Sequence, residues 1–137
     1  MHVDASCHCG FITYEAEIDP ASVTICHCTD CQIFTSSAFR IVAVAKASTF
    51  RLLSGKPNVY VKTAESGRKR AHSFCPHCGT PMYASAASDA PELYGLRIGA
   101  IRQRALLRPV RQIWCRSAFD WINDIGTIPH TETTALT

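Results

Sequence analysis

Hydrophobic positions along this chain mostly recur with a period of two, which is the spacing of β-strands. Residues 11–18 are the clearest case, because one face carries only apolar or aromatic side chains: Ile12, Tyr14, Ala16 and Ile18. Apolar and β-branched runs predict further strands at residues 39–45, 50–53, 59–63, 68–74, 82–85, 93–98 and 110–114. The first three of these are expected to form a meander. A helix of one or two turns is expected at residues 117–122.

The length of 137 residues predicts a single domain, which we expect to span residues 1–129. Residues 130–137 are mostly polar and are expected to form a mobile tail. Hydrophobic residues make up 47% of the chain, enough for a real core, and Trp114, Phe119 and Trp121 are expected to belong to it. No stretch approaches the roughly 20 apolar residues of a membrane span, so no membrane partner is expected.

Seven of the eight cysteines lie in three tight clusters: Cys7-His8-Cys9, Cys26-His27-Cys28-Thr29-Asp30-Cys31 and Cys75-Pro76-His77-Cys78. Spacings of one or two residues suit chelation of one ion by neighbouring thiolates. The alternative, a disulfide framework, is typical of shorter secreted domains. The chain starts without the charged and apolar regions of a signal peptide, so we expect the reducing cytoplasm. The eighth cysteine, Cys115, is expected to be a buried small apolar residue.

The cysteine count predicts two metal sites. Thiolate-rich tetrahedral sites favour zinc, with an iron–sulfur cluster as the minor alternative. Two pairs of cysteines make one closed structural site, and the remaining three make a site with a free fourth position, as a catalytic zinc requires. Spacing leaves open which pair joins Cys75 and Cys78, because closing a loop of 66 rather than 44 residues costs only about 0.4 kcal/mol more.

The residues between the cysteines have predictable orientations. Side chains two apart on an extended backbone point the same way, so His8 and His27 are expected to point away from the metal. Gly79 is expected to adopt the left-handed conformation that lets backbone N–H groups point at the sulfurs of Cys75 and Cys78. His77, inside that turn, is expected to be exposed.

The formal net charge of +3 falls to zero once four thiolates on one Zn²⁺ contribute −2 and three on another contribute −1. Nucleic acid is therefore not an expected partner. Arginines gather in the second half of the chain, and most are expected on solvated strand faces: Arg97, Arg102, Arg104, Arg108, Arg111 and Arg116.

The order of short motifs along residues 7–129 is specific. It runs Cys-x-Cys-Gly, Cys-His-Cys-x-x-Cys, Ser37-Ala38-Phe39, Phe50-Arg51-Leu52, Phe74-Cys75-Pro76-x-Cys78-Gly79-Thr80-Pro81 and Ile113-Trp114-x-x-Ser117. In this order the chain resembles the glutathione-dependent formaldehyde-activating enzyme family, also called the centromere protein V domain family. Gln112 stands where relatives often show His, so no role is assigned to that side chain.

The resemblance implies an all-β, Mss4-like (β-tent) fold of short antiparallel strands stapled by zinc. It also implies two zinc ions per chain. A structural zinc would be bound by Cys7, Cys9, Cys75 and Cys78, and a catalytic zinc by Cys26, Cys28 and Cys31. This division agrees with the four-plus-three count.

The resemblance further implies a zinc-dependent carbon–sulfur lyase or synthase, whose reaction would be similar to the formation of S-hydroxymethylglutathione from formaldehyde and glutathione. The expected partner is a small thiol such as glutathione, and one or two arginines could receive its carboxylates. Three thiolates make zinc a weak Lewis acid, so holding a substrate thiol as thiolate fits better than ionising water. Candidates for the proton relay are His27, Asp30, Tyr94 and Asp124.

Two other classes of function remain open at this point, and the oligomeric state is not predicted. One is a zinc-stapled protein or nucleic-acid binding module without catalysis, and the other is a thiol redox or metal-buffering protein. The free fourth position favours the lyase.

Overall fold

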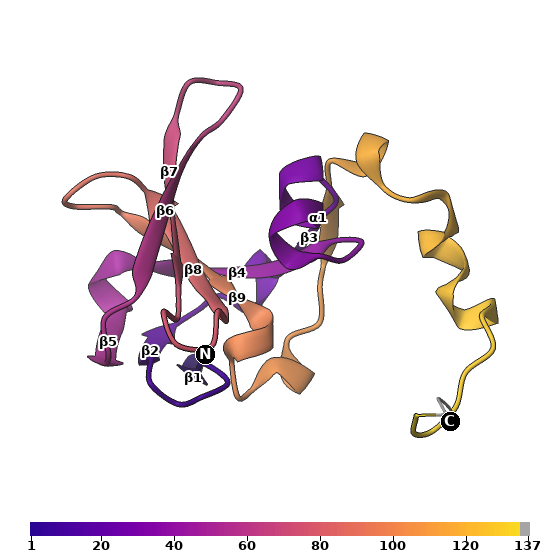
Figure 1. The fold of residues 1–137 in the computed structure, drawn as a ribbon, viewed down its shortest axis with the longest axis horizontal. Coiled ribbons are helices and arrows are strands. Elements are labelled where there is room, and N and C mark those ends of the chain that lie inside the picture. The colour runs from indigo at the N-terminus through magenta and orange to yellow at the C-terminus, as the bar shows by residue number, and fades with distance from the viewer. Residues whose placement is uncertain (135–137) are drawn as a thin grey trace.

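A computed structural model describes residues 1–134, in which ten strands form two sheets (Figure 1). The smaller sheet has the order β1-β2-β5, with β1 at His2–Ser6, β2 at Thr13–Glu17 and β5 at Arg51–Ser54. The larger sheet has the order β10-β3-β4-β9-β8-β7-β6. Its strands are β3 at Thr24–Cys26, β4 at Arg40–Lys46, β6 at Asn58–Thr63, β7 at Lys69–Phe74, β8 at Pro81–Ala86, β9 at Leu93–Arg97 and β10 at Arg111–Ile113. The all-β architecture expected from the sequence is confirmed.

Every predicted strand has an observed counterpart, with ends that differ by a residue or two. The period-two pattern correctly predicted the buried face of β2. Tyr14 and Ala16 on this strand are buried, and so are Ile12 and Ile18 next to its two ends. Two strands and the α-helix were not predicted, namely β1, β3 and α1 (Thr29–Thr35), and neither were the short 3₁₀ helices that precede β10. The strand β3 and the helix α1 overlap the second cysteine cluster. There the cysteines occupy positions that would otherwise show the hydrophobic period of a strand or a helix.

The predicted meander of the strands now numbered β4, β5 and β6 is wrong. β4 lies between β3 and β9, β5 pairs with β2 in the smaller sheet, and β6 pairs with β7. Sequential strands are neighbours only about two-thirds of the time, and here the chain changes sheets twice within a few residues. The true meander is β6-β7-β8-β9, in which all pairs are antiparallel. β10 instead pairs with β3 in parallel.

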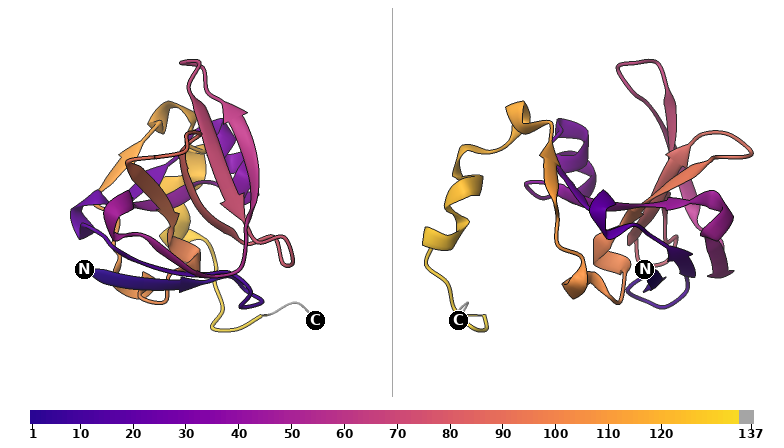
Figure 2. Two further views of the ribbon diagram at one scale, coloured as in Figure 1. Left: turned by 90° about the vertical axis from the view of Figure 1, so that its left-hand side faces the viewer. Right: turned by 180° about the vertical axis from the view of Figure 1, so that it is seen from behind.

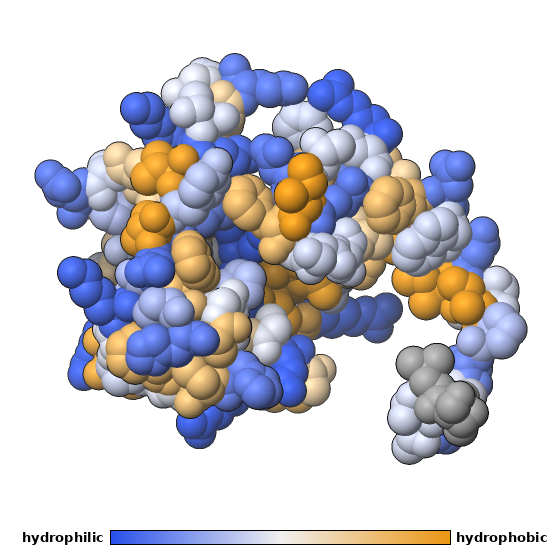
Figure 3. All heavy atoms as spheres, in the orientation of Figure 1, coloured by the Kyte–Doolittle hydropathy of each residue, from blue (hydrophilic) through white to orange (hydrophobic). Residues whose placement is uncertain are grey.

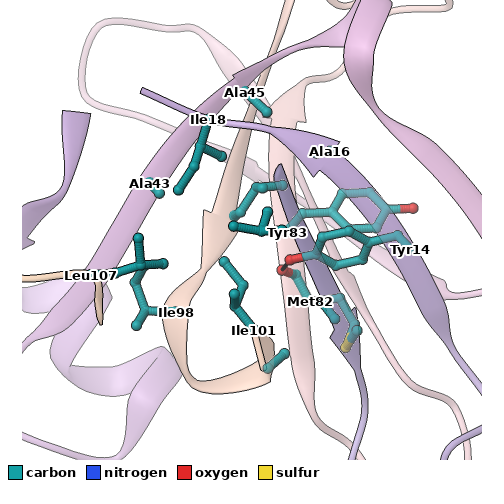
Figure 4. Close-up of a cluster of buried hydrophobic side chains, with 14 of the residues drawn as sticks. Tyr14, Ala16, Ile18, Ala43, Ala45, Met82, Tyr83, Ile98, Ile101 and Leu107 are labelled. Carbon is teal, nitrogen blue, oxygen red and sulfur yellow. Dashed lines mark hydrogen bonds between the residues drawn. The ribbon is translucent and has the colours of Figure 1, made fainter. Parts of the chain in front are cut away.

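The core lies between the two sheets (Figure 4). Tyr14 and Met82 are fully buried there. The ring of Tyr14 contacts those of Phe50 and Tyr83, with centroids 5.1 and 5.8 Å apart, and Tyr94 packs on the same two rings at 4.3 and 5.4 Å. Aromatic pairs at these distances add to the stability that their buried area provides. The core therefore depends on β2, β8 and β9, and the turns that carry Cys7, Cys9, Cys75 and Cys78 lead directly into β2 and β8.

The expectation that Trp114, Phe119 and Trp121 belong to the core is wrong, because these side chains are 47%, 41% and 48% exposed. Cys115 is exposed as well, not buried. After β10 the chain leaves the sheets in two 3₁₀ turns, Cys115–Ser117 and Asp120–Thr127, and runs outward without a covering sheet face (Figures 1 and 2). Hydrophobic side chains consequently show on the surface of this segment (Figure 3).

The expected tail at residues 130–137 carries no helix or strand over 130–134, and residues 135–137 lie outside the described part of the chain. Its mobility stays a prediction, as does the domain boundary at 129. No helix within residues 1–134 is long and apolar enough to span a membrane.

The turn after β5 offers a test of the fold at Gly55. Its φ is +77°, and a Cβ there would lie 2.4 Å from the carbonyl oxygen of Phe11 and 2.6 Å from Cδ1 of Ile12. Gly67 has φ +82° but no atom within 4 Å of such a Cβ. Both alanine variants are strained by a positive φ, so Gly55→Ala should lose about 1–3 kcal/mol more unfolding free energy than Gly67→Ala. Urea denaturation measures both, and equal losses would show that this turn can move away from Phe11.

Candidate metal centres

The first group of cysteines consists of Cys7, Cys9, Cys75 and Cys78, whose sulfurs lie within 4.8 Å of one another. The sulfur of Cys9 is 3.6 Å from that of Cys7 and 3.7 Å from that of Cys75. Tetrahedral zinc with Zn–S bonds of about 2.3 Å places its sulfurs about 3.8 Å apart, whereas disulfide sulfurs lie about 2.05 Å apart. The group therefore has the dimensions of a four-thiolate zinc site.

Two turns position these four thiols. Cys7 follows β1, and its sulfur accepts the N–H of Ile12 at 3.2 Å. Cys75 and Cys78 lie in the turn from β7 to β8, where the N–H of His77 points at the sulfur of Cys75 at 3.4 Å. Gly79 has φ +78°, so the predicted left-handed conformation is confirmed. It lets the chain turn back toward the sulfurs without a Cβ penalty.

The histidines of the first group do not join it. His8 is exposed, but residues 8 and 9 form a turn, so the extended backbone assumed for this pair is wrong. His77 is exposed, as predicted, and stacks on Phe11 with centroids 4.1 Å apart.

The hydroxyl of Thr80 lies 3.1 Å from the sulfur of Cys78 and, with backbone N–H groups, lowers the pKa of that thiol to about 5. A ready thiolate favours metal binding.

The second group consists of Cys26, Cys28 and Cys31, whose sulfurs also lie within 4.8 Å of one another. Cys26 ends β3, Cys28 is the N-cap of α1, and Cys31 lies in its first turn. The N–H of Cys31 donates to the sulfur of Cys28 at 3.3 Å, so a thiol replaces the usual oxygen cap. Among residues 1–134, no fourth cysteine, histidine or carboxylate joins the group. Three ligands with a free fourth position fit a zinc site that is open to a substrate.

The thiols of Cys26 and Cys31 have pKa values that are shifted in opposite directions. A hydrogen bond from Cys26 lowers the pKa of Cys31 to about 5, and Cys28 and Arg40 contribute further. The same contact raises the pKa of Cys26, with burial adding to it. Arg40 is near because β3 and β4 are antiparallel and place it directly opposite Cys26. The group thus holds a thiolate on Cys31 at neutral pH.

His27 is fully buried and lies outside this group of sulfurs, in agreement with the expectation that it points away from the metal. Its Nε2 lies 2.7 Å from Oε1 of Gln112 and donates to it. The amide of Gln32 in turn donates to the carbonyl oxygens of His27 at 3.1 Å and Ser117 at 2.9 Å. Gln112, to which the sequence assigned no role, therefore links β10 to the loop that carries Cys26 and Cys28.

The four candidates for the proton relay lie in different surroundings. Tyr94 stacks on Phe50 in the core region, and Asp124 lies in the outward C-terminal segment. Only Asp30 lines a cleft together with Cys28, a space of about 690 Å³. Lys62 lines the same cleft, and its Nζ lies 2.5 Å from Oδ2 of Asp30. The Asp30–Lys62 pair therefore shares a cleft with the second group, whereas His27 is buried against Gln112. No pattern in the sequence pointed to Lys62.

A small cavity of about 160 Å³ lies between the elements that carry the two cysteine groups. Arg40 of β4, His72 of β7 and Arg97 of β9 supply its polar lining. The aromatic part of the lining includes Phe34, Tyr60 and Tyr83. Sequence reasoning missed Arg40, His72 and Phe34. The available signal was a charged residue at the start of an otherwise apolar strand, since Arg40 precedes Ile-Val-Ala-Val-Ala.

The electrostatics of this cavity are dominated by positive charge. Burial, followed by the nearby Arg40, lowers the pKa of Arg97 to about 9, so Arg97 remains protonated at neutral pH. Burial and then Arg97 lower the pKa of His72 to about 4. The neutral ring of His72 accepts a hydrogen bond at Nδ1 from Nη2 of Arg97 at 3.2 Å. The cavity thus contains two cationic guanidinium groups and an uncharged imidazole.

Three comparisons place this chain among known proteins. The family described as glutathione-dependent formaldehyde-activating enzyme matches residues 2–117. A Schizosaccharomyces pombe protein named as an uncharacterized lyase is 30% identical over 80 residues, which cover 58% of this chain and 55% of that protein. The match thus spans about half the length of that relative. A crystal structure of a Rhodobacter sphaeroides protein is similar with a TM-score of 0.60 and 24% identity, covering 80% of this chain and 98% of that one.

Proposed function

Because the chain belongs to the glutathione-dependent formaldehyde-activating enzyme family, we propose that it is a zinc-dependent carbon–sulfur lyase or synthase. Its substrate would be a small thiol such as glutathione, joined to or released from an aldehyde such as formaldehyde. The observation that carries the proposal is the open three-thiol group of Cys26, Cys28 and Cys31. The lyase name of the Schizosaccharomyces pombe relative supports the same class. We place the protein in the cytoplasm, where thiols stay reduced.

The two groups of thiols would have different tasks. Cys7, Cys9, Cys75 and Cys78 would hold a structural zinc, because they close a site between chain segments that are distant in sequence. Zinc held by Cys26, Cys28 and Cys31 would bind the substrate thiol as a thiolate and leave its sulfur electron-rich.

Residues beside the second group would transfer the proton that the reaction requires. In the synthetic direction, the substrate sulfur forms a bond to the carbonyl carbon of formaldehyde while the C=O π electrons move to oxygen, which then takes a proton. The Asp30–Lys62 pair lines the cleft beside Cys28, so we assign to Lys62 the delivery of that proton and to Asp30 its orientation. The reverse reaction breaks the carbon–sulfur bond and returns the proton.

The proposal is tested by replacing the bound metal with cobalt and adding matched thiols. A thiol that completes the tetrahedron should change the visible absorption bands, whereas its S-methylated analogue should leave them nearly unchanged. Because the bound form is the thiolate, binding releases a proton, and affinity should rise as the pH approaches the pKa of the free thiol. Equal spectral responses to both ligands would contradict the proposal. Oligonucleotide binding that weakens steeply with salt would instead favour a binding module.

A further inference from the structure

The cavity between the two cysteine groups contains an unbalanced positive charge. Arg40 is only 5% exposed, and its Nε has no hydrogen-bond partner. None of the ion pairs within residues 1–134 includes Arg40 or Arg97, and no carboxylate lines the cavity. Within residues 1–134, the Arg97 guanidinium has one side-chain hydrogen bond, to the neutral ring of His72. A buried charge without a counter-ion is costly, so such a site favours an anion.

The cysteines cannot neutralise both guanidinium groups. Arg40 lies directly opposite Cys26 in the register of β3 and β4, beside the second cysteine group. Three thiolates with one Zn²⁺ carry a net charge of −1, which balances one arginine. Arg97 pairs in register with Val42 of β4, two residues from Arg40, so both arginines lie on the same face of the sheet. One positive charge on that face therefore still lacks a partner.

The size and lining of the cavity limit what it can take. About 160 Å³ is small beside the roughly 300–1,000 Å³ of sites for larger ligands, so the cavity itself accommodates a carboxylate with a short carbon chain. Phe34, Arg40 and Arg97 also line an adjoining space of about 520 Å³, which has room for the rest of a longer thiol. Phe34 forms an aromatic wall, with its ring stacked on His72 at 4.4 Å and the Arg40 guanidinium 5.8 Å from its centroid. Phe34 is three residues after Cys31 on α1, so this wall begins on the same side of the helix as the thiol.

We propose that the Arg40–Arg97 cavity binds a carboxylate of the substrate thiol, and that the substrates are consequently thiols that carry a carboxylate within a few bonds of the sulfur or at the end of a short arm. This inference rests on the proposed function, because it places the sulfur at Cys26, Cys28 and Cys31. Two guanidinium groups suit a carboxylate, which they can bind with paired, charge-assisted hydrogen bonds. The aromatic wall would cover the carbon chain between the two ends.

The test compares 3-mercaptopropionate with its methyl ester on the cobalt-loaded protein. We expect the acid to bind at least roughly tenfold more tightly, because only the acid can form charge-assisted hydrogen bonds with the two guanidinium groups. The negative carboxylate makes the thiol of the acid harder to ionise than that of the ester, so a preference for the acid cannot come from thiol ionisation. Arg97→Gln should remove the preference. Arg108→Gln, which changes an exposed arginine, should keep it.

Further measurements separate this inference from the proposed function. Equal affinities for acid and ester in the unchanged protein, or a preference that survives Arg97→Gln, would overturn the carboxylate site while leaving thiol coordination intact. If neither thiol changes the cobalt bands, the proposed function fails. Calorimetry with propionate then tests the carboxylate site by itself. Propionate binding that is lost in Arg97→Gln supports the site, and the absence of propionate binding overturns it. Should Arg97→Gln not fold, Arg97→Lys keeps the charge but loses the paired geometry, and an undiminished preference in that variant would equally overturn the inference.

Discussion

Cys78→Ser is expected to lose the metal of the first group and to unfold at ordinary temperature, whereas Cys115→Ser should fold with its metal content unchanged. Both cysteines are exposed, so neither substitution creates a cavity in the core. The difference lies in the metal, because binding to a structural four-thiolate site contributes about 10–16 kcal/mol in small zinc domains. That contribution is comparable to the whole stability of a domain, about 5–15 kcal/mol.

Elemental analysis and thermal unfolding followed by circular dichroism measure this outcome. The two variants share their chemistry and their exposure, so a general effect of losing a thiol would appear in both. A Cys78→Ser protein with the unfolding temperature and zinc content of the Cys115→Ser protein would show that the first group does not stabilise the fold through a metal.

Cys31→Ser is expected to abolish thiol binding while the fold and the metal of the first group remain. Cys31 lies on the seven-residue helix α1, which has no fully buried residue, so the core of the two sheets does not depend on it. Its loss leaves two thiols and weakens the second metal. We expect thiol affinity to fall by more than the roughly 10–100-fold that losing an outer-shell partner of a metal costs.

Calorimetry with 3-mercaptopropionate and elemental analysis check this division of tasks, with Cys115→Ser again as the matched control. Loss of both metals in Cys31→Ser would mean that the two groups are coupled through the cavity between them. Undiminished thiol affinity in Cys31→Ser would show that the second group does not bind the substrate thiol.

Local patterns in the sequence predict some parts of this fold and not others. Alternation at Tyr14 and Ala16 predicted both the strand and its buried face, because a strand repeats every two residues whatever surrounds it. The prediction that Trp114 and Trp121 belong to the core was wrong because burial, unlike the strand period, depends on the surroundings. Hydrophobicity indicates that a side chain gains from burial, but not whether the fold supplies a surface to cover it.

The candidate site was predictable in its cysteines and not in its arginines. The four-plus-three division follows from counting thiols, yet the partner of Cys75 and Cys78 could not be derived from loop length. The closeness of Arg40 to Cys26 depends on the register of β3 and β4, which no local pattern fixes. Arg97 joins them through the register of β4 and β9. Long-range strand pairing therefore assembles the chemical environment of the thiols.

The position of Trp114 also affects how this protein can be observed. Trp114 and Trp121 are the only tryptophans in the chain. Trp114 lines the cleft that contains Cys28, and Trp121 lies on the outward C-terminal segment. Intrinsic tryptophan fluorescence should therefore report the arrival of a ligand beside Cys28, whereas the melting of the two sheets should be followed through the buried tyrosines.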